Sequence, residues 1–250
     1  MQQAWEGIDL LDGLEKGFLG ERALQEELWA AGFKPSRLRT RQPPGLPPPP
    51  RLVLDDMVND YFWVPAYKLT SANEDELFCL KSMQQALEGT RSLKAHRPWQ
   101  QGKARFANTV AEIERVAGLP EGFRYWISRI ALPNFTKAGE TAVRAETERQ
   151  LTLAALALKR YQLRYSKAAP DLAALVPDFL SAIPYDCMSG AALHYHFKPD
   201  GTFLLYSVGE DGRDNGGDPT SAATNRFDLW DGRDAVWPTP AKENRENHQP

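Results

Sequence analysis

The sequence predicts an α+β protein in which a mostly helical N-terminal region precedes a long amphipathic helix packed on a small antiparallel sheet with an acidic loop. Three observations lead to this prediction. Apolar residues recur at helical spacing through most of residues 1–165, the apolar period becomes two between Leu193 and Val208, and a loop rich in aspartate and glycine follows. The chain has 250 residues, 42% of them apolar, which is enough to bury one large core or two smaller ones.

The first fifty residues divide into a helix and a spacer. Residues 1–34 are predicted as a helix, because apolar residues recur every three or four positions from Leu10 to Trp29. Residues 35–51 are predicted as a proline-rich spacer, since the six prolines of Pro43–Pro50 favour extended polyproline II. A spacer makes few long-range contacts, so we expect residues 1–50 to be dispensable for the folding of the rest.

Residues 52–135 are predicted to form a helical region with three helices. The first begins after Ser71, which with Glu74 has the spacing of a capping box. The second spans Lys103–Ala117 and ends at a Gly-Leu-Pro sequence, and the third spans Phe123–Leu132 and ends at a proline.

Residues 136–237 are predicted to form a separate module that begins with a helix of roughly 30 residues, well above the usual length. Its apolar stripe consists of Val143, Thr147, Leu151, Ala154, Leu158, Tyr161 and Tyr165. A short helix is expected at Pro170–Val176, and an antiparallel hairpin is expected from Leu193–Phe197 and Phe203–Val208. Because an isolated hairpin is only marginally stable, we expect the stripe to cover it.

The hairpin is followed by a loop, a strand and a tail. The loop, Gly209–Asp218, is dense in aspartate and glycine, and Phe227–Trp230 is predicted as a short closing strand. Residues 238–250 are polar and are predicted to be a disordered tail.

Several short segments of this module occur in a distinctive order. They are Leu156–Tyr161, Tyr165, Asp171–Pro177, Ile183–Asp186, Ser189-Gly190, Leu193–Tyr195 and Leu205–Gly212. In this order they resemble the soluble part of the major pseudopilins of type II secretion systems. They resemble even more closely the pseudopilin-like C-terminal segments of large envelope proteins in Planctomycetes and Verrucomicrobia. The resemblance covers about residues 140–232 and implies a helix-on-sheet fold with a role in the cell envelope or in protein secretion.

The acidic loop is the best candidate site. Calcium takes about six to eight oxygen ligands, and Asp211, Asp214 and Asp218 supply three carboxylates, with Asp228 able to return from the closing strand. The resemblance implies a structural calcium held by Asp211 and Asp228 together with backbone carbonyls around Ser207 and Val208. The loop lacks the spacing of an EF-hand, and the alternative interpretation is a solvated Asp/Gly turn without an ion.

Other candidate ligands and nucleophiles have simpler interpretations. His194 and His196 share one strand face and could bind a metal, but no carboxylate or thiol stands near them in the sequence, so surface or half-buried strand histidines are favoured. Cys79 and Cys187 are interpreted as small buried residues, since a disulfide between them requires an oxidising compartment. The sequence contains none of the common motifs of hydrolases, metalloproteases or nucleotide-binding enzymes.

The charge of the chain excludes some partners. With 30 basic and 33 acidic residues, the formal charge of −3 gives no electrostatic basis for binding nucleic acid or an anionic membrane through a polybasic patch. No apolar run reaches the roughly 18 residues that span a bilayer, and the first twenty residues lack the pattern of a signal peptide. The sequence itself indicates no compartment; the resemblance implies the envelope or periplasm.

These observations favour a non-catalytic structural or interaction component of the bacterial cell envelope, with protein partners or self-association and a structural calcium. Two alternatives stay open. One is an enzyme, hydrolase-like, with a site in residues 52–135. The other is a protein-binding module that recruits a partner through Pro43–Pro50 and exposed aromatic residues.

Overall fold

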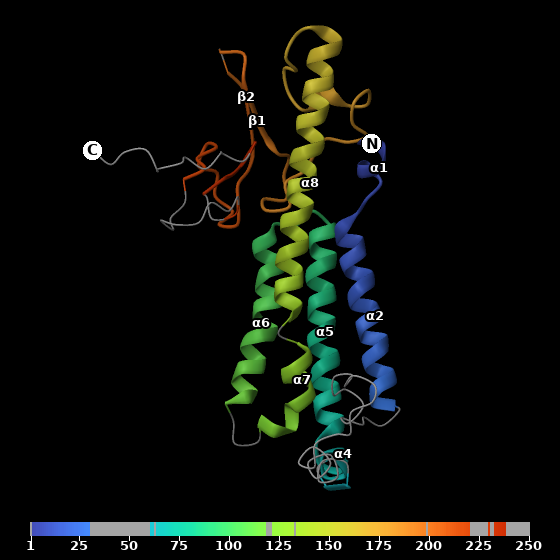
Figure 1. The fold of residues 1–250 in the computed structure, drawn as a ribbon. Coiled ribbons are helices and arrows are strands. Elements are labelled where there is room, and N and C mark those ends of the chain that lie inside the picture. The colour runs from blue at the N-terminus through green and yellow to red at the C-terminus, as the bar shows by residue number, and fades with distance from the viewer. Residues whose placement is uncertain are drawn as a thin grey trace, which may run out of the picture. The chain divides into compact units, whose positions relative to one another are not determined.

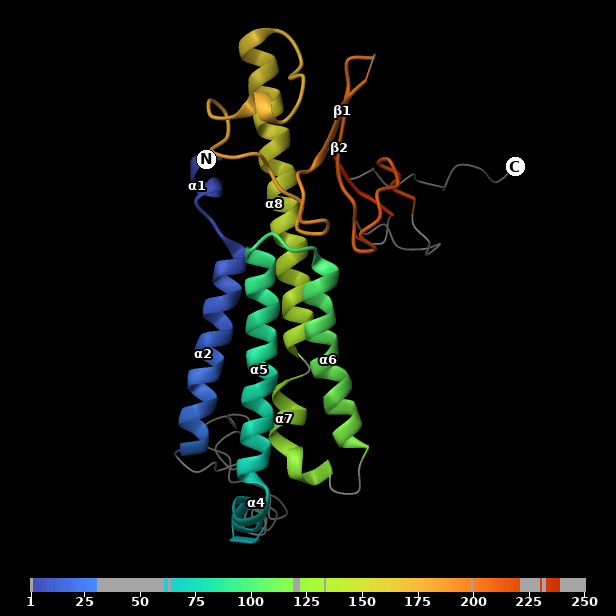
Figure 2. The same ribbon diagram turned by 180° about the vertical axis from the view of Figure 1, so that it is seen from behind.

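The computed structural model describes residues 2–30, 61–62, 64–118, 122–132, 134–198, 200–220, 230 and 233–238. Over these residues it confirms the α+β prediction, with seven α-helices and one three-stranded antiparallel sheet (Figures 1 and 2). No helix in the described ranges combines the length and the apolarity needed to cross a membrane. The predicted spacer, residues 35–51, lies outside the described residues, so the domain boundaries placed around it stay predictions.

The chain forms two compact units. Unit 1 consists of residues 1–15, 88–105 and 137–250, and unit 2 consists of residues 16–87 and 106–136. Four of the described helices contribute residues to both units: α2 (Leu10–Ala30), α5 (Ala72–Lys94), α6 (Trp99–Ala117) and α8 (Asn134–Tyr165).

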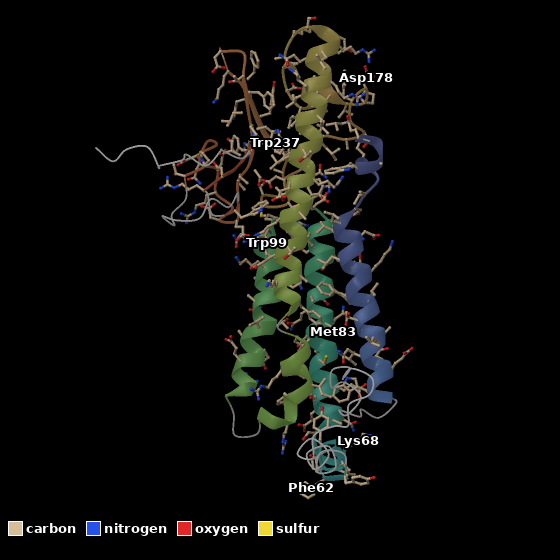
Figure 3. All side chains as sticks on the ribbon, in the orientation of Figure 1. Phe62, Lys68, Met83, Trp99, Asp178 and Trp237 are labelled. Carbon is tan, nitrogen blue, oxygen red and sulfur yellow. The ribbon has the colours of Figure 1, made fainter. Side chains whose placement is uncertain are left out.

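In its described residues, unit 2 has helices and no strand. It also contains α4 (Val64–Thr70), the 3-10 helix η3 (Gly122–Tyr125) and α7 (Trp126–Ala131). Its core contains Cys79, Met83 and Leu132, with Phe135 packed against them. Figure 3 shows the position of Met83 on α5. The Phe18 ring of α2 meets Phe135 edge-on, with ring centroids 5.2 Å apart. Residues of α2 therefore belong to this core.

Unit 1 combines α8 with the sheet, whose strands are β1 (His194–Phe197), β2 (Phe203–Ser207) and β3 (Ala235–Trp237) in the order β1-β2-β3. All neighbouring strands are antiparallel, with Leu205 of β2 opposite both Tyr195 and Trp237. Figures 1 and 2 both show the β1–β2 hairpin beside the C-terminal half of α8.

The predicted contact between the apolar stripe and the hairpin is confirmed for the second half of the stripe. Leu151, Ala154, Leu158 and Tyr161 belong to one buried cluster. The same cluster includes Leu193 and Leu205 of the sheet region, and Leu172, Leu175, Phe179 and Leu180 of the segment that follows α8. The last residue of the stripe, Tyr165, is instead exposed. The apolar period of α8 therefore identified its buried face except at the C-terminal end.

The predicted N-terminal helix is interrupted. It consists of α1 (Gln2–Glu6) and α2, separated by Gly7, Ile8 and Asp9. The Asp9 carboxylate accepts the N–H of Asp12 at 2.8 Å, which caps the start of α2 and explains the new beginning. The sequence pattern missed this because apolar spacing continues across the break.

Contacts of residues 1–30 also argue against their being dispensable for folding. In unit 1, Leu11 is buried, and Lys94 forms ion pairs with Asp12 at 2.8 Å and with Glu15 at 2.7 Å. In unit 2, Phe18 is 4% exposed and contacts aromatic rings of that unit. We therefore expect removal of these residues to open the apolar core of each unit.

Two further elements differ from their predictions. The short helix expected at Pro170–Val176 is only the 3-10 helix η4 (Ala173–Leu175), started by the Asp171 carboxylate, which accepts the Ala174 N–H at 2.8 Å. The strand that closes the sheet is β3, whereas the sequence placed it at Phe227–Trp230, of which residues 227–229 lie outside the described residues. The prediction for Phe227–Trp230 therefore stays untested, and β3 is a strand that the sequence pattern did not identify.

Candidate functional site

The loop that follows β2 is the predicted site, and two glycines fix its course in unit 1. Gly209 has φ +70° and Gly217 has φ +79°, a backbone region that other residues rarely adopt. A Cβ on Gly209 would lie 2.5 Å from the Arg233 carbonyl oxygen, and one on Gly217 would lie 2.6 Å from a Leu204 methyl carbon. The loop therefore folds tightly against β2 and against the residues that precede β3.

Asp234, which stands directly before β3, holds this loop together. Its side chain is buried, and its Oδ2 atom accepts the backbone N–H groups of Asn215 at 3.1 Å, Gly217 at 2.7 Å and Asp218 at 3.1 Å. A buried carboxylate is stable only when hydrogen bonds replace its lost hydration, and three amide donors do so here. Sequence reasoning missed Asp234 because its partners stand 16 to 19 residues away.

Asp186 is a second buried carboxylate, at the base of the loop. One oxygen accepts the Ser207 hydroxyl at 2.7 Å and the Met188 N–H at 2.9 Å, and the other accepts the Val208 N–H at 3.1 Å. The side chain is 0% exposed. Asp186 thereby joins its own turn to the end of β2, just where the acidic loop begins.

Asp214 lies on the face of the sheet where the two histidines stand. Its carboxylate accepts the Tyr206 hydroxyl at 3.0 Å and the Gly216 N–H at 2.9 Å, and its other oxygen lies 3.5 Å from His194 Nδ1. The Gly216 N–H, the Tyr206 hydroxyl and the nearby histidines hold the pKa of Asp214 below its ordinary value, against the opposing effect of burial. Burial and this same hydrogen bond raise the pKa of Tyr206 to about 12.

The two histidines share one face of β1, as their spacing predicts. The His194 ring stacks on Tyr206 with centroids 4.8 Å apart, and the His196 ring lies 6.1 Å from the same tyrosine. Sequence reasoning placed no carboxylate near them, whereas the fold brings Asp214 to His194. The contact arises because the loop folds back along β2, the strand paired with β1. No local sequence pattern reveals this course.

The other two described candidate ligands hold turns of their own. Asp211 is exposed and accepts the Arg213 N–H at 2.9 Å. Asp218 accepts the Thr220 N–H at 3.0 Å and lies 3.3 Å from an Arg233 guanidinium nitrogen, and the Thr220 bonds are the main reason that the pKa of Asp218 is lowered. Together with Asp214, each carboxylate accepts the amide two residues ahead, as in an Asx turn.

The three aspartates therefore do not converge on one point in the described part of the loop. Within the described ranges, no group of three or more His, Cys, Asp or Glu side chains is placed to hold a metal ion. Asp228, the ligand expected from the closing strand, lies outside the described residues, so the calcium prediction stays a prediction. What the structure does show is a loop folded by Asp234 and by local turns.

Glu210 anchors the loop to two helices of unit 1. Its carboxylate accepts a hydrogen bond from the Arg144 guanidinium of α8, and its backbone carbonyl accepts one from the Gln100 amide of α6. Arg144 also lies over the Trp230 ring, whose indole N–H donates to Glu148 at 3.0 Å. The loop is thus held by Asp186 at the end of β2, by the contacts of Glu210 with two helices, and by Asp234 before β3.

A second polar cluster lies in unit 2, inside the region 52–135 that sequence reasoning left open for an enzyme. Asp75 of α5 is 0% exposed and accepts the Tyr67 hydroxyl at 2.6 Å, the Ile127 N–H at 2.9 Å and the Ser128 N–H at 3.1 Å, as well as the Ser128 hydroxyl. The two amides belong to the first turn of α7. Asp75 therefore caps a helix in the way that a local N-cap residue would.

Both cysteines are free and buried. Burial is the main reason that the pKa of each thiol, Cys79 and Cys187, rises to about 12. At neutral pH both are protonated thiols and therefore poor nucleophiles. The interpretation of the cysteines as small buried residues is confirmed.

Comparisons with known proteins find no matching family, no matching curated protein and no matching solved structure.

Proposed function

We propose that this chain is a non-catalytic structural or interaction component of the bacterial cell envelope, related to the pseudopilins of type II secretion. The observation that supports this proposal is the organisation of unit 1. A small antiparallel sheet packs on a helix of 32 residues, and the acidic loop begins at the end of β2. This order of elements is the one that the resemblance of residues 140–232 implies.

The electrostatics of the described residues also support a structural role. Asp75, Asp186 and Asp234 are buried and bind backbone amides, so their carboxylates hold the fold rather than face an open cleft. The cysteine thiols are kept protonated by burial. A catalytic base or nucleophile needs both access to substrate and a pKa suited to its task.

The two alternatives have less support. In residues 52–135, the convergent titratable groups around Asp75 are explained by the capping of α7. The proline stretch Pro43–Pro50, on which a protein-binding module would rest, lies outside the described residues and stays a prediction.

Gene deletion in the source bacterium tests the proposal. An epitope-tagged copy should sediment with the envelope fraction, and deletion should reduce the amount of exported protein in the medium severalfold. Export should be restored by the parent and by Leu163→Ala, which changes a side chain that is 73% exposed, but not by Asp186→Ala, which removes a buried anchor. A tagged protein confined to the cytosol, with export unchanged by deletion, would contradict the proposal.

A further inference from the structure

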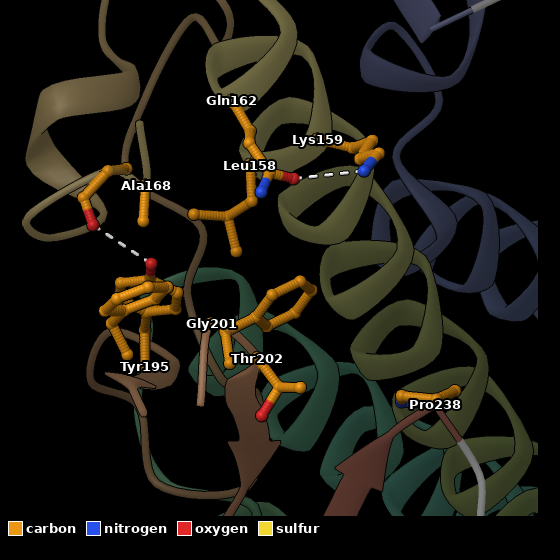
Figure 4. A pocket seen from close by; sticks show the side chains of 11 residues that line it. Leu158, Lys159, Gln162, Ala168, Tyr195, Gly201, Thr202 and Pro238 are labelled. Carbon is orange, nitrogen blue, oxygen red and sulfur yellow. Dashed lines mark hydrogen bonds between the residues drawn. The ribbon is translucent and has the colours of Figure 1, made fainter. Parts of the chain in front are cut away.

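A cavity of about 340 Å³ opens in unit 1 between α8 and the tip of the β1–β2 hairpin (Figure 4). Its apolar wall consists of Leu158, Ala168, Ala169, Tyr195, Phe197 and Phe203. The volume lies within the range of sites that hold small molecules, at its lower end. It lies on the opposite face of the sheet from the histidines and the acidic loop, because side chains alternate along a strand.

The cavity exists because the hairpin diverges from α8 between Leu205 and the tip of the hairpin. Leu205 is fully buried against α8, whereas Phe197, at the end of β1, is 50% exposed. On the β1 side the Tyr195 hydroxyl donates to the Ala169 carbonyl at 3.0 Å, which fixes the wall there. The aromatic walls are thus held in place and leave an open mouth between them.

Among the described residues, one cation lines this apolar space. Lys159 of α8 lies at the edge of the cavity, and its ammonium group donates to the Gln162 side chain at 3.0 Å, a neutral partner. None of the described residues that line it is acidic. From Arg149 to Pro170 the chain contains no aspartate or glutamate, while it contains Lys159, Arg160, Arg164 and Lys167.

The nearest acidic residue in the sequence of the hairpin bonds to Thr202, a residue of the cavity lining. Asp200 stands in the turn, and its carboxylate accepts both the N–H of Thr202 at 2.9 Å and the Thr202 hydroxyl at 2.6 Å. The cavity therefore has an apolar interior and a positive charge at its α8 edge, while the Asp200 carboxylate is paired with Thr202 at the hairpin edge. Such a site is complementary to a ligand with an apolar body and a single negative charge.

We propose that this cavity binds a small apolar carboxylate, such as a medium-length fatty acid. The alkyl chain lies against Leu158, Tyr195 and Phe203, where its transfer from water drives binding. The carboxylate pairs with Lys159, replacing the neutral contact to Gln162. This inference goes beyond the structural role proposed above and does not depend on it.

Titration calorimetry with octanoate tests the proposal, with octanol as the probe that has the same chain and no charge. The parent should bind octanoate saturably and about tenfold more tightly than octanol. Lys159→Gln should weaken octanoate binding about tenfold and leave octanol binding unchanged. Lys167→Gln, which removes an exposed lysine that does not line the cavity, should change neither affinity more than twofold.

The position of the ligand is tested separately on the parent by methyl NMR. The methyl signals of Leu158 should shift on addition of octanoate, whereas those of the exposed Leu163 should not. The absence of saturable octanoate binding would overturn the proposal. So would equal affinities for octanoate and octanol, an unchanged affinity in Lys159→Gln, or shifts that bypass Leu158.

Discussion

Two neighbouring regions of unit 1 are stabilised in opposite ways. One is the contact between α8 and the sheet, and the other is the loop after β2. The first is apolar: Leu151, Leu158 and Leu205 belong to one buried cluster, and their spacing along the chain predicts that they share it. The second is polar: the loop depends on Asp186 and Asp234, two carboxylates from outside it. Apolar contacts tolerate small displacements, whereas a buried carboxylate requires each amide donor in place.

The largest effect should come from the polar anchor at the base of the loop. Asp186→Ala leaves the Val208 and Met188 N–H groups and the Ser207 hydroxyl without an acceptor inside the protein. Each buried group left unpaired costs roughly 1–3 kcal/mol, so for three groups we expect a loss of at least about 3 kcal/mol in the free energy of unfolding. Chemical denaturation measures this loss.

Asp211→Ala is the matched control, because Asp211 is an exposed aspartate of the same loop. It should change the free energy of unfolding by less than about 0.5 kcal/mol in the absence of calcium. Equal losses in the two variants would show that burial does not distinguish these carboxylates, and the contrast between the two regions would fail.

Truncation of a side chain in the apolar contact between α8 and the sheet should lower the free energy of unfolding somewhat less. Leu158→Ala removes a side chain that is 4% exposed, and such truncations cost roughly 2–5 kcal/mol. We expect a value in the lower half of this range, because Leu158 also lines the open cavity and so lacks neighbours on one side. Leu163→Ala on the same helix, at 73% exposure, should be nearly neutral in the same denaturation experiment.

Calcium should have a smaller effect, on the loop alone. If Asp211, Asp214, Asp218 and Asp228 bind calcium with an affinity of about 10⁻⁴–10⁻³ M, millimolar calcium adds on the order of 1 kcal/mol. Thermal melting should then shift upward with calcium, less with magnesium and not with a chelator, and Asp228→Ala should abolish the shift. Identical melting curves in calcium and in chelator would show that Asp234 folds the loop without an ion.

The smallest effect should be the pH dependence of Asp214. The pKa of this carboxyl is lowered in the folded state, so its stabilising contribution is fully present above its unfolded pKa and is lost as the pH falls through the folded value. Its side chain is 47% exposed, and solvent screening keeps the contribution small. Asp214→Asn should therefore differ from the parent near neutral pH and converge with it as the pH falls below the folded-state pKa of Asp214. A difference that grows toward low pH would have the wrong sign.

Sequence reasoning succeeded where structure follows a local period. The stripe from Val143 to Tyr161 and the antiparallel hairpin of β1 and β2 are visible in the spacing of apolar residues, and both are confirmed. It failed at the start of α2, where the carboxylate of Asp9 caps a new helix while apolar spacing continues. It also did not find β3, since strand composition does not specify which stretch pairs with β2.

The candidate site was only partly accessible to the same reasoning. The density of aspartate and glycine identified the loop, and the spacing of the histidines placed them on one face. The residues that fold the loop, Asp186 and Asp234, stand 16 or more residues away from the amides that they bind in it, and local spacing does not reveal such contacts. A buried acid recognised by its amide donors is a property of the tertiary structure.

The position of Asp234 links the loop to the edge of the sheet. Asp234 binds the amides of Gly217 and Asp218 through its side chain, and its own N–H donates to the Asp218 carbonyl at 3.0 Å. Ala235, the next residue, begins β3. The loop can detach from a paired β3 only if all of these hydrogen bonds break at once. We therefore expect the loop and β3 to open together as one cooperative unit. In hydrogen exchange, the amide of Gly217 would then share the protection of the strand that follows Asp234, although it lies in a loop by backbone conformation.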